Sequence, residues 1–173
     1  MRIMTKYSAF LICEDTRQML LEKFPASYPR VRADHITFEF GAEEFGALFH
    51  PSKIEVTGMV DDGKGMQALI VTVDGQQYKP NGSPYHITLS YDTKQKVREE
   101  LGQKGKYRAS IANDLVKHVL ENDDSPFFFA KLDPPLEIKT YPALVEKHPD
   151  GSKTIQAMPQ PVPTDAPRPP SCS

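Results

Sequence analysis

Short runs in which apolar and polar residues alternate, separated by Gly, Pro, Asn and Asp, predict a chain built mostly from β-strands. Alternation places one side of each strand against a core and leaves the other side for polar groups. The predicted strands are residues 6–13, 34–40, 53–60, 66–73, 85–91, 127–132 and 136–141. The turn-rich segment 61–65 lies between two of them, which indicates a β-hairpin.

Few segments have helical spacing. We expect a short helix over residues 16–24, capped by Asp15 or Thr16. A second short helix is expected over residues 113–120, and a helical turn over residues 45–49. The helices are therefore minor elements beside the strands.

Two segments differ in composition from the rest. Residues 102–108 contain Lys104, Lys106 and Arg108 together with two glycines, which predicts a mobile basic loop. We expect this loop to affect substrate binding more than chemistry, because mobile charges steer phosphate rather than transfer protons; a solvated surface loop is the alternative. Six of the sixteen residues of segment 158–173 are Pro, which predicts a disordered, partly polyproline tail. One folded domain is thus expected over residues 1–157, followed by this tail.

Composition and charge exclude several classes of protein. The 39% of hydrophobic residues suffices for a core, and the net charge of −2 disfavours a general electrostatic grip on long nucleic acid. The longest apolar run near the start, residues 9–13, is too short for a signal peptide or a membrane span. Two cysteines are too few for a disulfide framework or a Cys-rich zinc site, so a cytoplasmic location is expected.

A hexapeptide pattern occurs twice, each time on a predicted strand. Residues 35–40 are His-Ile-Thr-Phe-Glu-Phe, and residues 86–91, 51 positions later, are His-Ile-Thr-Leu-Ser-Tyr. Residues two apart in a strand share a face. His35 and Thr37 are therefore expected on one face of their strand, with Ile36, Phe38 and Phe40 on the other. By the same rule His86 and Thr88 share a face, opposite Ile87, Leu89 and Tyr91.

Two such pairs are suited to cutting a phosphodiester. One imidazole can take a proton from the attacking oxygen while the other gives a proton to the departing oxygen, since histidine titrates near neutrality, at about 6.5. The two Thr hydroxyls can donate hydrogen bonds to the phosphate oxygens on which charge develops. The site would need no metal and no cofactor, and its rate should follow a bell around pH 6 to 7.

A metal site competes for the same residues, because two histidines and the carboxylate of Glu39 could form a facial triad. Glu39 lies four positions beyond His35, about 13 Å along a strand, whereas ligands lie about 2 Å from one ion. We therefore expect no metal, and we expect Glu39 to line a substrate groove. His50, His118 and His148 lack the strand pattern and are expected in structural or surface roles.

At His35-Ile-Thr37 and His86-Ile-Thr88 the chain resembles the 2H phosphoesterase superfamily, and the resemblance covers approximately residues 5–145. Residues 58–62, 67–71 and 84–90 are similar to small RNA-repair-type members found in phage genomes and to viral anti-CBASS nucleases. The resemblance implies an α+β fold of two lobes, with antiparallel sheets flanking a central cleft and short helices outside. It also implies that the His and Thr residues of both motifs are catalytic and bind phosphate.

The function expected on this basis is a metal-independent phosphodiesterase that cleaves a ribonucleotide phosphodiester. The expected substrate is a cyclic oligonucleotide signal of bacterial immunity, degraded as viral counter-defence in the host cytoplasm. An RNA-repair enzyme acting on RNA ends with a 2′,3′-cyclic phosphate is the first alternative, and a module that binds nucleotides without turnover is the second. No long duplex and no membrane are expected as partners. The two strands are nearly identical, so the sequence does not indicate which histidine is the base.

Overall fold

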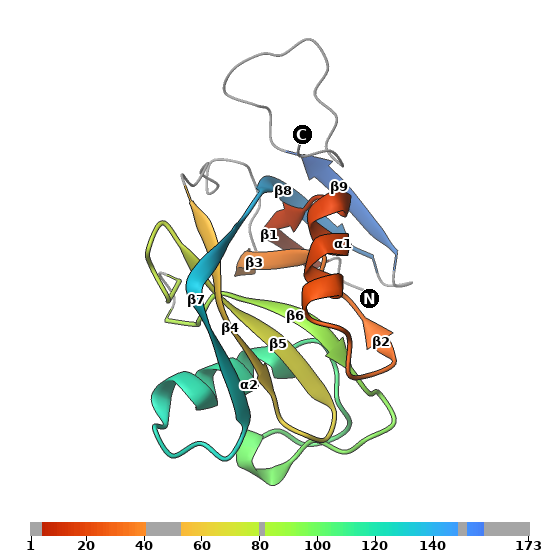
Figure 1. The fold of residues 1–173 in the computed structure, drawn as a ribbon. Helices are drawn as coiled ribbons and strands as arrows, with labels where there is room; N and C mark the ends of the chain where they lie inside the picture. The colour runs from red at the N-terminus through yellow and green to blue at the C-terminus, as the bar shows by residue number, and fades with distance from the viewer. Residues whose placement is uncertain (1–4, 41–52, 80–81, 149–151, 158–173) are drawn as a thin grey trace.

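Two antiparallel β-sheets form the protein in the computed structural model, which describes residues 5–40, 53–79, 82–148 and 152–157 (Figure 1). Sheet A contains, in spatial order, β3 (His35–Phe40), β1 (Thr5–Ile12), β8 (Thr140–Lys147) and β9 (Lys153–Ala157). Sheet B contains β2 (Arg30–Val31), β6 (His86–Tyr91), β5 (Met66–Val73), β4 (Ile54–Asp61) and β7 (Phe128–Ile138). Every neighbouring pair is antiparallel, so the α+β class with antiparallel sheets is confirmed.

Two helices and one 3₁₀ turn, Glu99–Leu101, accompany the sheets in the described residues. Helix α1 (Glu14–Lys23) starts earlier than predicted, and Asp15 and Thr16 lie inside its first turn rather than at its cap. Two acidic residues in that turn favour a helix start there, because the amino end of a helix carries partial positive charge. Helix α2 (Ile111–Glu121) confirms the second predicted helix.

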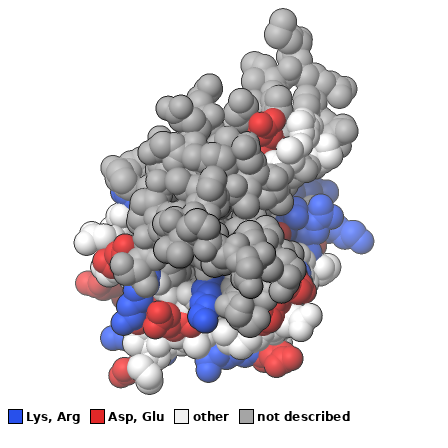
Figure 2. Space-filling model, turned by 90° about the horizontal axis from the view of Figure 1, so that it is seen from above, with Lys and Arg blue, Asp and Glu red and all other residues white. Residues whose placement is uncertain are grey.

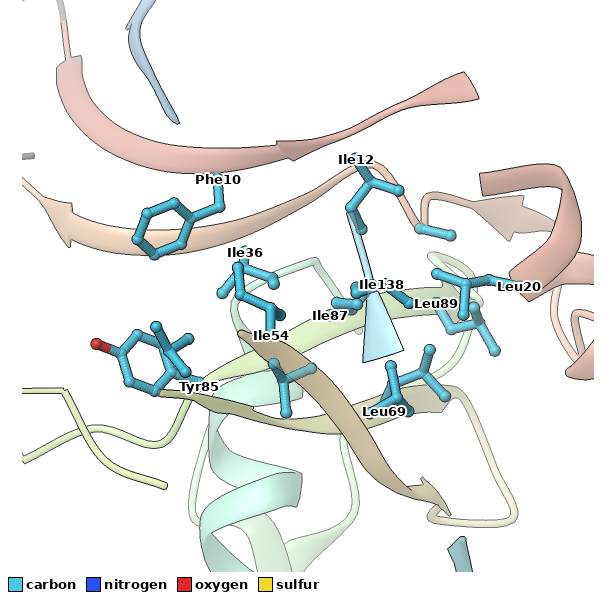
Figure 3. Close-up of a cluster of buried hydrophobic side chains, with 14 of the residues drawn as sticks. Phe10, Ile12, Leu20, Ile36, Ile54, Leu69, Tyr85, Ile87, Leu89 and Ile138 are labelled. Atoms are coloured by element: carbon cyan, nitrogen blue, oxygen red, sulfur yellow. The ribbon is translucent and has the colours of Figure 1, made fainter. Parts of the chain in front are cut away.

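The main hydrophobic core lies between the two sheets. Its largest contributors from sheet A and α1 face those of sheet B in Figure 3: Phe10, Ile12, Leu20 and Ile36 against Ile54, Leu69, Ile87 and Leu89. Ile36, Ile87 and Leu89 are completely buried. The apolar faces of both motif strands thus anchor in one shared core.

A second core covers the opposite face of sheet B. The apolar side of α2 packs there, with Ile111, Ala112, Leu115 and Val116 buried. Strand β5 lies between the two cores and is buried on both faces. A strand buried on both faces needs apolar residues at nearly every position, so the β5 sequence shows little alternation of apolar and polar residues.

The structure departs from the predicted strands in three places. The predicted strands 127–132 and 136–141 belong largely to one strand, β7, in which residues 132–135 stand opposite the single residue Thr57 of β4. Strands β2, β8 and β9 were not predicted. The predicted helical turn 45–49 and tail 158–173 lie outside the described residues.

Asp62 organises the loop between β4 and β5. Its Oδ1 accepts hydrogen bonds from the backbone N–H groups of Lys64, Gly65 and Met66 at 2.9, 2.9 and 3.1 Å. Its Oδ2 accepts a hydrogen bond from the hydroxyl of Tyr107, and both side chains are buried. A Cβ on Gly65 would collide with the Tyr107 ring, so glycine is required at this close approach.

The chain passes from sheet B to sheet A at Ala33, between β2 and β3. The N–H of Ala33 donates to the carbonyl of Thr88 in β6 at 2.8 Å, and the next carbonyl, that of Asp34, accepts from Ile12 N–H of β1 at 3.0 Å. Ala33 is completely buried and has a φ of 60°, in the left-handed region. This joint brings β3 alongside β6.

Candidate active site

Both motif strands present their His and Thr on the face opposite the main core. In β3, Ile36 points into the core, so its neighbours His35 and Thr37 point the other way. In β6, Ile87 and Leu89 point into the same core. The predicted alternation is therefore confirmed for the His-Ile-Thr part of each motif.

Strand β3 contacts β6, and the charge of His35 acts on His86. Arg30 pairs with Tyr91 and Val31 with Ser90. The hydrogen bond from Ala33 to Thr88 described above is the last of this pairing, and the chain then leaves β6 to pair with β1 as β3. The structure thus brings together two histidines that lie 51 positions apart in the sequence.

His86 has an environment that favours its neutral form. Its Nδ1 lies 3.1 Å from the carbonyl oxygen of Pro84. A carbonyl only accepts, so Nδ1 carries the hydrogen and the lone pair of the neutral ring is on Nε2. Burial, then the positive charge of Lys79 and more weakly that of His35, lower the pKa of His86 to about 4, although the Pro84 carbonyl acts in the opposite direction.

His35 has a different partner. Its Nδ1 lies 2.7 Å from Oδ1 of Asp34, and the side chain of His35 is 23% exposed. The carboxylate orients the ring and accepts the Nδ1 hydrogen, so Nε2 is the nitrogen placed to exchange a proton with a substrate. The repeat did not identify Asp34, because the second motif has Tyr85 in the corresponding position.

The two motif threonines differ in exposure. Thr37 is half-buried. Thr88 is buried, and its Oγ1 lies 3.4 Å from the carbonyl oxygen of Ala109, the weak end of the range for a hydroxyl hydrogen bond. A hydroxyl rotates freely about its C–O bond, so the hydrogen of Thr88 can turn to a stronger acceptor.

The basic segment 102–108 is held in place, contrary to the prediction of a mobile loop. Backbone hydrogen bonds join Gly105 to Val97 and Tyr107 to Gln95 at 2.9 and 3.0 Å, and the Tyr107 ring is buried.

The three basic side chains of this segment are exposed. Nη1 of Arg108 donates to the carbonyls of Lys104 and Lys106 at 3.0 and 3.1 Å. Arg108 directly precedes Ala109, the neighbour of Thr88, so the end of the segment lies beside the second motif.

A one-residue bulge follows each motif threonine. Thr37 and Glu39 pair with consecutive residues of β1, as Thr88 and Ser90 do with β5. A bulge interrupts alternation. Tyr91 accordingly packs in the α2 core, so its predicted place beside Ile87 was wrong.

The same interruption affects the prediction for Glu39. Its side chain lies outside the described part of the structure, and the unbroken alternation that placed it with His35 does not hold at this point of β3.

The remaining described histidines have structural surroundings. The ring of His118 packs 4.9 Å from that of Phe127 and its Nδ1 contacts Ser125 Oγ at 3.0 Å. Nε2 of His148 contacts Thr154 Oγ1 at 2.6 Å. His50 lies outside the described residues.

Sequence reasoning also missed Lys79. This lysine is 7% exposed, and its charge acts on His86. The only signal in the sequence is its position before Pro80-Asn81-Gly82, residue types that favour turns, shortly before the second motif.

Charged side chains of both signs lie on one face of the molecule. On the described surface seen from above in Figure 2, Lys and Arg lie interspersed with Asp and Glu. Among the described residues, no three His, Cys, Asp or Glu side chains are grouped so as to hold a metal ion. Within the same residues, no helix has the length and apolar character needed to cross a membrane.

Comparisons of the chain with protein-family models, with curated proteins and with solved structures find no match.

Proposed function

We propose that the protein is a metal-independent phosphodiesterase of the 2H phosphoesterase type that acts on a small ribonucleotide ester. The observation that carries this proposal is the proximity of the two His-x-Thr motifs on strands of different sheets. Both motifs point away from one shared core, β3 contacts β6, and the charge of His35 acts on His86. Two imidazoles in different surroundings suit a reaction that needs one base and one acid.

We infer the roles of the two histidines from their surroundings. Nε2 of neutral His86 takes the proton of the attacking hydroxyl, either a ribose 2′-hydroxyl or water. The resulting oxygen bonds to phosphorus while the bond from phosphorus to the leaving oxygen breaks. His35, held by Asp34, gives its Nε2 proton to that leaving oxygen. Thr37 and Thr88 donate to the non-bridging phosphate oxygens, where charge accumulates.

A cyclic oligonucleotide is the preferred substrate within this class. The net charge of −2 and the mixed surface charges favour a compact anion over a long duplex, whose affinity depends on many Lys and Arg contacts. RNA ends with a 2′,3′-cyclic phosphate need the same acid and base, with water as the attacking group. Cleavage of immune signals as viral counter-defence, in a cleft between two lobes, belongs to the same proposal.

A turnover assay with EDTA present tests the class and the substrate together. The panel contains cyclic di- and trinucleotides and an RNA end with a 2′,3′-cyclic phosphate. Cleavage of a cyclic oligonucleotide in EDTA supports the preferred substrate, and cleavage of the RNA end alone supports the alternative. Binding without cleavage of any compound would support a sequestering module instead. Activity lost in EDTA and restored by zinc or manganese would contradict the acid–base mechanism.

The pH profile tests the role of His86. We expect kcat/KM to rise with pH through about 4 and to fall where the general acid loses its proton. The reason is that burial and Lys79 lower the pKa of His86 to about 4, so the base is already neutral well below pH 6. The rise of kcat/KM on the acidic side therefore occurs at a lower pH than it would for two imidazoles of ordinary pKa. An acidic limb near pH 6.5 would contradict this assignment.

Thr88→Val should lower kcat by about 10²- to 10³-fold, because it removes one donor to the developing phosphate charge and keeps the β-branched shape. Thr37→Val should act similarly. Thr57→Val is a matched control, since Thr57 Oγ1 also donates to a backbone carbonyl at 3.4 Å, that of Ile70, but lies outside the motifs. Steady-state kinetics on the three variants decide the point: equal rates for Thr88→Val and Thr57→Val would show that the motif hydroxyl does not contact the reacting phosphate.

A further inference from the structure

Lys79 occupies a turn that leads directly to His86. Its backbone N–H donates to the carbonyl of Ser83 at 2.7 Å, and its own carbonyl accepts from Gly82 N–H at 2.9 Å. Tyr78 pairs with Pro84 across the same hairpin, and the Pro84 carbonyl accepts from Nδ1 of His86. The position of Lys79 relative to His86 is therefore set by backbone hydrogen bonds.

The side chain of Lys79 is buried. It is 7% exposed, and within the described part of the chain no carboxylate forms a salt bridge with it. Burial lowers the pKa of Lys79 to about 8. Lysine is almost never buried unless it is paired, because removing an ammonium from water without a partner is costly. The cost indicates that an anion is the intended partner.

The groups around His86 support an anionic ligand at this place. Lys79 and His35 both lower the pKa of His86 through their positive charge, so three nitrogen groups share a small region. The carboxylate of Asp34 contacts Nδ1 of His35. A phosphate oxyanion would compensate the positive charge of Lys79.

We propose that Lys79 is a phosphate-binding residue of this site, which contacts a non-bridging or flanking phosphate oxygen of the bound ester while His86 faces the reacting hydroxyl. The proposal rests on the proposed function for the identity of the ester, but the affinity of the pocket for phosphate can be measured without any turnover. Lys79 transfers no proton in this scheme, and its contribution is to bind and position the anion.

The test is a titration with inorganic phosphate followed by NMR of the His86 ring, in the wild type, Lys79→Met, Lys79→Arg and the control Lys94→Met. Lys94 is an exposed lysine outside the hairpin. We expect phosphate to bind Lys79→Met at least tenfold more weakly than the wild type. Lys79→Arg should stay within a few-fold of the wild type, and Lys94→Met should bind unchanged. Without phosphate, Lys79→Met should also raise the pKa of His86, since one positive charge is removed.

A measurement on the wild type alone keeps the test decisive if Lys79→Met fails to fold. Saturating phosphate should raise the pKa values of both Lys79 and His86, because a bound anion favours their charged forms. If neither value changes, or if Lys79→Met binds phosphate as tightly as the wild type, the proposal is wrong. Phosphate binding that depends on Lys79, without cleavage of any ester, would leave this proposal standing and overturn the proposed function. Cleavage of an ester by the wild type, with phosphate binding unchanged in Lys79→Met, would leave the proposed function standing and overturn the proposal for Lys79.

Discussion

Replacing His86 by alanine is expected to reduce turnover by about 10²- to 10⁴-fold, because the variant has no base for the attacking hydroxyl. His35→Ala should have an effect of the same size, because it removes the acid. Neither ring packs in the main core, which is anchored by Ile36 and Ile87 on the opposite side of the strands. Both variants should therefore stay folded, and steady-state kinetics with circular dichroism will measure the two properties together.

His148→Ala is the matched control, since it removes an imidazole that follows β8 and contacts Thr154 of β9. It should retain the wild-type rate. The double variant of His35 and His86 should be little slower than either single variant, because the two groups act as a unit. Wild-type turnover in folded His35→Ala or His86→Ala would refute the two-histidine mechanism.

Asp62→Ala should lower the free energy of unfolding by about 3 to 5 kcal/mol. The carboxylate accepts three backbone N–H groups of the β4–β5 loop and the hydroxyl of Tyr107, all in a buried place. Alanine would leave these donors without an acceptor and out of reach of bulk water. Such a loss is a large share of the roughly 5 to 15 kcal/mol that stabilises a domain of ordinary size. Urea unfolding followed by circular dichroism will measure it.

Two companion variants separate the network from a general effect of charge. Asp62→Asn keeps one oxygen for the backbone donors and should cost about 1 to 3 kcal/mol. Asp124→Ala removes an exposed carboxylate beyond α2 and should change stability by less than about 0.5 kcal/mol. Equal unfolding energies for Asp62→Ala and Asp124→Ala would show that the loop does not depend on this network.

The predictable part of the fold and of the candidate site was the part encoded by local alternation. The strands of both motifs, the β4–β5 hairpin and α2 could be located because each has a regular apolar pattern or a turn signal at its ends. The same rule correctly placed Ile36 and Ile87 in the core and left His35 and His86 on the other face.

Features that depend on distant partners could not be predicted. The bulge at Leu89 exists only relative to β5, and it sends Tyr91 to the opposite face from the one that alternation gives. Strand β2 has two residues and is defined by its pairing with β6 rather than by its own pattern. Lys79 reads as an ordinary surface residue before a turn, and only tertiary packing buries it.

The joint at Ala33 also determines when the candidate site can form. The hydrogen bond from Ala33 to Thr88 closes a long loop of chain, and such contacts carry a loop-closure entropy that short-range contacts avoid. Strands β1 and β3 lie near each other in the sequence and supply one imidazole, while the other arrives only with β6. His35 and His86 meet only when β3 comes to lie beside β6, so proton-transfer chemistry is a property of the assembled fold and is absent from any partly folded intermediate in which these strands are still apart.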